Sequence, residues 1–164
     1  MIAFEPGRRM PLEQGECHDP DLRSRAVAAR FDGAASPEGV RAGLLIYAGA
    51  WNEAHNVAQD LHTPEGSYWH AILHRQEPDA WNSGYWFRKV GRHAVYEQVR
   101  VTAEALGYAP EPLGYARGRQ WDAARFIEFC EEARTRPGSA MERLAIEVQF
   151  AEWQALLDWC ARAR

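Results

Sequence analysis

Three times in its first half, the chain places a good helix-capping residue directly before a proline: Asp19-Pro20, Ser36-Pro37 and Thr63-Pro64. An Asp, Ser or Thr side chain accepts a hydrogen bond from the first helical turn, and proline fits the first helical position because its missing N–H is not needed there. Each pair therefore predicts the start of a helix. The predicted helices span residues 20–31, 37–48 and 64–76, and the third ends before Pro78.

Similar signals divide the rest of the chain, and strand signals are almost absent. They predict a short helix that begins at Asn52 and a last helix that begins at Ser139. Between these, helices are predicted from Asp79 or Asn82 to Gly91, from Ala94 to Gly107 and from Asp122 to Arg134. Residues 1–18 are expected to be irregular, and the Pro/Gly-rich residues 107–120 to form one long loop. The pattern predicts an all-α fold, with about eight short helices in stacked antiparallel hairpins that form a single domain.

The last predicted helix, residues 139–163, is apolar on two faces. One stripe contains Met141, Leu144, Ala145, Val148, Ala155 and Trp159, and the other contains Ile146, Phe150, Trp153, Leu157 and Cys160. An apolar stripe has to be covered by another element, so two stripes require neighbours on two sides. We therefore expect this helix to be largely buried.

Two stretches of the chain are similar to each other. GAWNEAHNVA at 49–58 and DAWNSGYWFR at 79–88 share Ala-Trp-Asn at an offset of 30 residues, which predicts two similar hairpins. AGAWNEA also resembles the turn and second-helix start of a tetratricopeptide repeat, with Gly49, Trp51 and Ala54 at the spacing of that family. The resemblance covers one hairpin, and the second copy departs from it. It implies stacked hairpins rather than membership of the family.

Composition excludes several classes of function. The 164 residues carry a formal charge of -4, so the chain as a whole does not attract phosphate backbones, and we expect no nucleic-acid partner. No apolar run approaches the roughly 20 residues of a membrane helix, and the N-terminus has no signal-peptide pattern, so a cytoplasmic protein is expected. Cys17, Cys130 and Cys160 are widely spaced, which favours free thiols over disulfides or a thiolate zinc site.

Residues 67–93 combine aromatic and polar side chains more densely than any other stretch. Flat apolar walls with a few polar groups are typical of small-molecule pockets, and arginine binds carboxylates or phosphates through paired hydrogen bonds. This hairpin is therefore expected to bind a small polar or anionic ligand, or a protein partner. The predicted ligand-binding residues are Trp69, Arg75, Asp79, Trp81, Asn82, Tyr85 and Arg88. The alternative is that the tryptophans are core residues and the basic residues a solvated helix end.

Histidines in the same region suggest a metal site. His70 and His74 are four residues apart, so on a helix both rings project from one face and can bind the same ion. His55 from the preceding hairpin can join them because short connections keep consecutive helices adjacent, and Glu77 or His93 could complete the site. The HExxH motif is missing, so the pattern does not include a built-in general base. The alternative is that these histidines are ordinary packed or exposed residues.

The sequence alone therefore leaves two possible functional classes. The first is a soluble, noncatalytic binding domain that uses residues 67–93 as its recognition surface. The second is an enzyme that depends on a divalent metal, held by His55, His70 and His74, and uses metal-activated water. The two classes differ in whether the protein contains a bound metal ion, and the sequence does not decide this.

Overall fold

The structure, a computed structural model, describes residues 7–109 and 120–163, and within these ranges it contains helices and one isolated bridge between Ala34 and Ala163. The eight helices are α1 (Pro20–Ala28), α2 (Pro37–Ala48), α3 (Trp51–Asp60), α4 (Pro64–Gln76), α5 (Ala80–Val90), α6 (Val95–Ala105), α7 (Ala123–Arg134) and α8 (Ala140–Ala161). The all-α prediction is confirmed. Most of the predicted loop at 107–120 lies outside the described residues.

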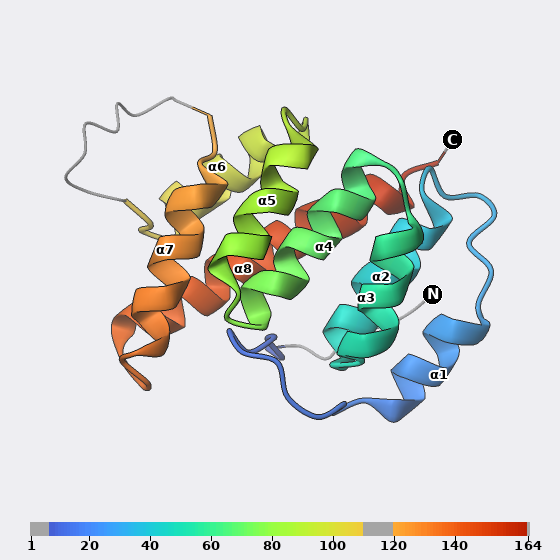
Figure 1. The fold of residues 1–164 in the computed structure, drawn as a ribbon, viewed down its shortest axis with the longest axis horizontal. Helices are drawn as coiled ribbons and strands as arrows, with labels where there is room; N and C mark the ends of the chain where they lie inside the picture. Colours follow the sequence, from blue (N-terminus) through green and yellow to red (C-terminus); the bar gives the residue numbers. More distant parts are fainter. Residues whose placement is uncertain (1–6, 110–119, 164) are drawn as a thin grey trace.

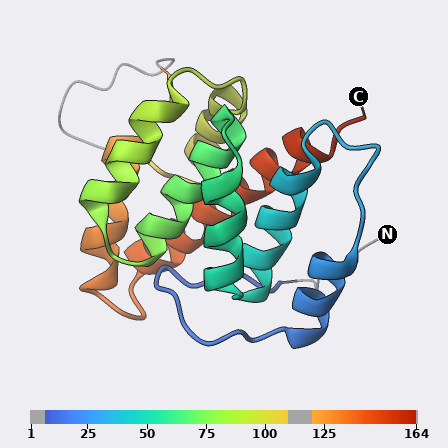
Figure 2. The ribbon, with the colours of Figure 1, turned by 45° about the vertical axis from the view of Figure 1, so that its right-hand side comes forward.

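The longest helix, α8, forms the back of the molecule. It crosses behind the α2–α3 and α4–α5 hairpins and packs against α2, α6 and α7 (Figures 1 and 2). Both predicted stripes contribute buried residues, among them Val148 and Trp153. The Trp153 indole donates a 2.8 Å hydrogen bond to the Gly43 carbonyl on α2. The helix is covered on more than one side, as its sequence indicates.

Side-chain caps begin most of the helices. The capping side chains, each of which accepts from the backbone N–H three residues later, belong to Asp19, Thr63, Asp79, Asp122 and Ser139. Asp79, and not Asn82, is therefore the cap of α5. Ser36 stands at the N-cap of α2 but makes no side-chain capping bond. The helix starts follow from these local hydrogen bonds, which is why the sequence predicts them well.

The first helix is shorter than predicted. It ends at Ala28, three residues before the expected end at residue 31, because Ala29 adopts an extended conformation. The Arg41 guanidinium on α2 donates to the carbonyls of Ala26 and Val27, both at 2.6 Å, and of Ala29 at 3.1 Å. These last-turn carbonyls have no partner within the helix. A side chain from a neighbouring helix therefore satisfies the end of α1.

The two similar stretches do not pack in the register that their sequence match at an offset of 30 residues suggests. The helices begin at Trp51 and Ala80, and the residues buried within them are Ala54 and Ala58 on α3 and Ser83, Phe87 and Val90 on α5. Ala54 therefore corresponds to Ser83, at an offset of 29 residues, and not to Gly84. The Ser83 hydroxyl donates a 2.8 Å bond to the Ala71 carbonyl on α4, which fixes that face against the neighbouring helix.

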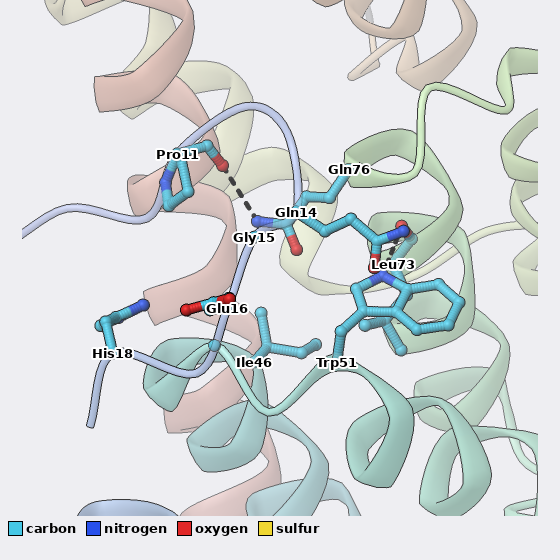
Figure 3. A pocket seen from close by; sticks show the side chains of 10 residues that line it. Pro11, Gln14, Gly15, Glu16, His18, Ile46, Trp51, Leu73 and Gln76 are labelled. Carbon is cyan, nitrogen blue, oxygen red and sulfur yellow. Dashed lines mark hydrogen bonds between the residues drawn. The ribbon is translucent and has the colours of Figure 1, made fainter. Parts of the chain in front are cut away.

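The N-terminal segment is irregular in its described part, residues 7–18, but it is firmly attached. Met10 and Leu12 are buried in the core. The Gln76 side chain on α4 donates to the Pro11 carbonyl at 3.1 Å (Figure 3). The Gln76 carbonyl accepts from the Gln14 backbone N–H at 2.8 Å. The segment therefore crosses the ends of α2 and α4 as an ordered strap.

A buried ion pair joins α4 to α8. Arg75 and Glu152 have fully buried side chains, and an Arg75 guanidinium nitrogen lies 2.6 Å from a Glu152 carboxylate oxygen. The Tyr68 hydroxyl donates to the other carboxylate oxygen at 3.0 Å. The guanidinium also lies over the Phe126 ring, 4.6 Å from its centre. Arg75 is therefore part of the core.

Two glycines on adjacent helices are expected to respond oppositely to alanine. A Cβ at Gly66 would lie 1.9 Å from the Leu61 backbone carbonyl oxygen, whereas at Gly84 its nearest neighbour is the flexible end of Arg88 at 3.3 Å. We expect Gly66→Ala to lower the free energy of unfolding by about 2 kcal/mol or more. Gly84→Ala should raise it by about 0.5 to 1 kcal/mol because alanine favours helix. Urea titration measures both, and equal effects would contradict the close α3–α4 approach.

In residues 7–109 and 120–163, no helix combines the length and the apolar character needed to cross a membrane. Cys17 is exposed, Cys130 and Cys160 are buried, and all three thiols are free, as predicted. Burial raises the pKa of Cys130 to about 11, so this thiol is protonated and unreactive at neutral pH.

Candidate metal centre

Three histidine side chains from two helices meet between α3 and α4. His55 comes from α3, while His70 and His74 lie one turn apart on α4. The Nε2 atoms of His55 and His70 are 2.9 Å apart. One nitrogen from each of the three rings falls within 4.8 Å of the other two. The sequence hypothesis that these rings share a common point is therefore consistent with the geometry.

Carboxylate and indole groups orient the three rings. The Nδ1 atom of His74 lies 2.9 Å from a Glu77 carboxylate oxygen, which favours a hydrogen on Nδ1 and leaves Nε2 free as a ligand. Trp51 stacks on His55 with ring centres 4.9 Å apart, and Trp86 stacks on His70 at 3.9 Å. The rings are thus held from both sides, by α3 and by α5.

Burial keeps two of the three rings, those of His55 and His70, uncharged. Burial, followed by the nearby charges of His55, His74 and Lys89, lowers the pKa of His70 to about 3. Burial, followed by the charge of His74, also lowers the pKa of His55. Metal ions bind the neutral imidazole, and protons compete for the same nitrogen. The burial of His55 and His70 therefore favours the form that binds metal.

One nitrogen of the cluster has no acceptor. The Nδ1 atom of His70 is buried and makes no hydrogen bond within the described part of the chain. If Nε2 binds a metal, Nδ1 carries the hydrogen, and a buried unpaired N–H costs about 1 to 3 kcal/mol. The free energy gained from the metal–nitrogen bonds has to exceed this cost. The donor set fits a metal, at an affinity below that of a site whose outer hydrogen bonds are complete.

Of the two further candidate ligands, one lies beside the cluster and the other does not. Glu77 contacts His74, and His74, Glu77 and Asp79 form a second group of potential ligands within 4.8 Å of one another. His93 instead lies 3.7 Å from Glu65 and packs edge-on against Tyr68 and Trp159. The helix break at Gly91 directs His93 toward α8, so it does not complete the site.

The seven predicted ligand-binding residues are not brought together on one surface. Trp69 and Arg75 are fully buried, whereas Trp81 is 75% exposed and stacks on the exposed Tyr85. Asp79 caps α5 and binds the backbone of Asn82, and Arg88 is exposed. The aromatic and polar residues of 67–93 thus divide between the core, a helix cap and the outer surface.

Two hollows lie near the histidines, and none of the seven residues lines either one. The smaller, about 50 Å³, lies beneath the N-terminal strap beside Trp51, Leu73 and Gln76 (Figure 3). It has room for water and little more. The larger, about 750 Å³, is an open groove whose wall includes Ser67, Trp86 and Lys89.

Trp51 is a residue of the site that the sequence alone did not indicate. Trp51 stacks on His55 and also donates from its indole to the Leu73 carbonyl at 3.2 Å, so it ties α3 to α4 at the cluster. It lies four residues before His55, and this helical spacing is the signal that could have linked the two. Trp86 and Lys89 belong to the 67–93 stretch that was expected to bind a ligand, but their place beside the histidines depends on which face of α5 turns toward α4.

Comparisons of the chain with protein-family models, with curated proteins and with solved structures find no match.

Proposed function

We propose that the protein binds a divalent transition-metal ion through His55, His70 and His74. The observation that carries the proposal is the approach of three imidazoles from two helices, with two ring nitrogens already 2.9 Å apart. Zinc-bound nitrogens at tetrahedral angles lie about 3.3 Å apart, given zinc–nitrogen distances of about 2.0 Å. The ring nitrogens need small movements to meet one ion.

Three histidines leave one tetrahedral position for water or a ligand. Zinc sites that catalyse reactions have this pattern, whereas structural sites use four protein ligands and are usually rich in cysteine. A bound ion would supply a Lewis acid and lower the pKa of its water to about 7. Imidazole donors suit zinc, copper, nickel and iron. The protein's own contribution is to orient the rings and to cover His55 with Trp51 and His70 with Trp86.

Metal content tests the proposal directly. Tag-free protein is loaded with zinc, dialysed and analysed for metal, and the affinity is measured by competition with a chelator. We expect about one zinc ion per chain, and loss of at least about 100-fold in affinity in His70→Ala/His74→Ala. His18→Gln is the matched control because it removes an exposed histidine away from the cluster. Equal zinc retention by the double variant and the wild type would overturn the proposal.

Glu77 is expected to act as a positioning residue for His74. Glu77→Gln keeps a hydrogen-bond acceptor but removes the charge 2.9 Å from the His74 Nδ1 atom. Loss of such an outer partner typically lowers metal affinity about 10- to 100-fold, and we expect a value near the lower end. Asp60→Asn, an exposed carboxylate change at the end of α3, serves as the control. Unchanged zinc affinity in Glu77→Gln would show that Glu77 does not orient the ligand.

A further inference from the structure

The larger hollow adjoins the histidine cluster through Trp86. Three helices carry residues from the cluster into its wall: Gln59 lies one turn after His55 on α3, Ser67 one turn before His70 on α4, and Trp86 on α5. Trp86 belongs to both the cluster and the hollow. Its ring stacks on His70 with ring centres 3.9 Å apart, and it also lines the hollow. We refer to this hollow of about 750 Å³, over the start of α4, as the outer groove.

The wall of the outer groove favours negative charge. Lys89 lies over the Trp86 ring, 4.4 Å from its centre, and makes no ion pair within the residues that the structure describes. The Ser67 hydroxyl adds a hydrogen-bond donor, and none of the described lining residues carries a carboxylate. Glu65, the acidic residue nearest in sequence, is not part of the wall: its carboxylate accepts from the Trp159 indole of α8 at 2.9 Å and from the Thr63 hydroxyl. This contrasts with the net charge of -4 on the whole chain.

The same wall also offers an apolar surface. Trp86 is half-buried, and Leu61 and Pro64 face the same hollow. Pockets for small organic ligands typically have volumes of about 300 to 1,000 Å³ and combine such flat surfaces with a few polar groups. The size and the chemistry of the outer groove therefore fit one small organic molecule.

We propose that the outer groove binds a small organic anion, a carboxylate or a phosphate ester, whose planar or apolar part lies on Trp86 and whose charge meets Lys89. The inference extends the proposed metal site, because a ligand in this groove lies next to the histidines and can approach the open position of the ion. The anion site itself is built from residues other than the three histidines.

The test uses phenyl phosphate, benzoate and uncharged benzyl alcohol as probes of the full chain. Each is titrated into zinc-free and zinc-loaded protein while the Trp86 indole N–H and Ser67 amide signals are followed by NMR, with Trp86→Phe used for assignment. We expect both signals to move with at least one anion and not with benzyl alcohol. Lys89→Gln should weaken binding about tenfold, the effect of losing one charged hydrogen bond.

Arg88→Gln is the matched control, since it removes the adjacent exposed cation of α5 outside the groove wall. It should change affinity less than about twofold. Equal binding of benzyl alcohol, absence of anion-induced shifts, or equal affinity in Lys89→Gln would overturn the inference. Which anion binds more tightly identifies the preferred charged group.

The zinc-free arm separates this inference from the proposed function. Anion binding that depends on Lys89 and persists in His70→Ala/His74→Ala supports the groove even if zinc does not bind. Zinc binding without anion binding supports the metal site and overturns the groove. Tighter anion binding to zinc-loaded protein supports the link between the two, and equal affinity with and without zinc overturns that link.

Discussion

Replacement of Glu152 by glutamine is expected to lower the free energy of unfolding by about 3 to 5 kcal/mol, because it leaves the Arg75 charge buried without its counter-ion. The two side chains are fully buried and 2.6 Å apart. Two further guanidinium nitrogens of Arg75, Nε and Nη1, have no hydrogen-bond partner in the described residues, so Glu152 is the group that balances the charge. Such a loss is a large part of the stability of a domain. Denaturant unfolding monitored by circular dichroism measures it.

The matched experiment removes both charges. The double change Arg75→Met/Glu152→Leu should recover most of the lost stability, because burying an ion pair costs solvation that its attraction offsets only partly. Tyr68 then loses its acceptor, and burial together with Glu152 raises its pKa, so it is a neutral hydroxyl in the native protein. A loss below about 1 kcal/mol in Glu152→Gln would contradict the described ion pair.

Zinc is expected to raise the melting temperature by about 5 to 10 °C when its free concentration is 100 times the dissociation constant. Binding to the native state alone contributes about 2.7 kcal/mol at that ratio. A chain of this size shifts by about 2 to 4 °C per kcal/mol. Calorimetry with zinc and with a chelator measures the difference for each variant against its own metal-free form.

The same measurement on variants identifies the ligands. His70→Ala/His74→Ala should show almost no zinc-dependent shift, because two of the three nitrogens are missing, whereas His18→Gln should keep the wild-type shift. Comparison with each variant's metal-free form separates metal binding from packing, since the His70 ring stacks on Trp86 and its loss also affects the core. An equal zinc-dependent shift in the double variant and the wild type would place the metal elsewhere.

The fold could be predicted because its signals are local. Asp19, Thr63 and Ser139 cap the helices that follow them, and each capping bond spans three residues. The histidine cluster was also within reach, since His70 and His74 share a face of one helix and α3 directly precedes α4. These inferences needed only helical spacing and short connections.

The role of Arg75 could not be predicted in the same way. Its partner, Glu152, lies 77 residues later, and helical periodicity carries no information about contacts at that distance. Gln149 and Glu152 are buried polar residues on a helix otherwise interpreted from its apolar stripes. An arginine within a stretch dense in aromatic and polar residues was therefore interpreted as a ligand-binding residue. The outer groove depends on how α3 and α5 are placed around α4, which is equally long-range information.

The most direct test of the metal site is an anomalous-difference map from crystals of zinc-loaded, tag-free protein, recorded on both sides of the zinc absorption edge. We predict one peak within about 2.0 to 2.1 Å of one ring nitrogen from each of His55, His70 and His74. Absence of a peak at this point, or a peak bound by other side chains while these three rings stay as they are, would contradict the account.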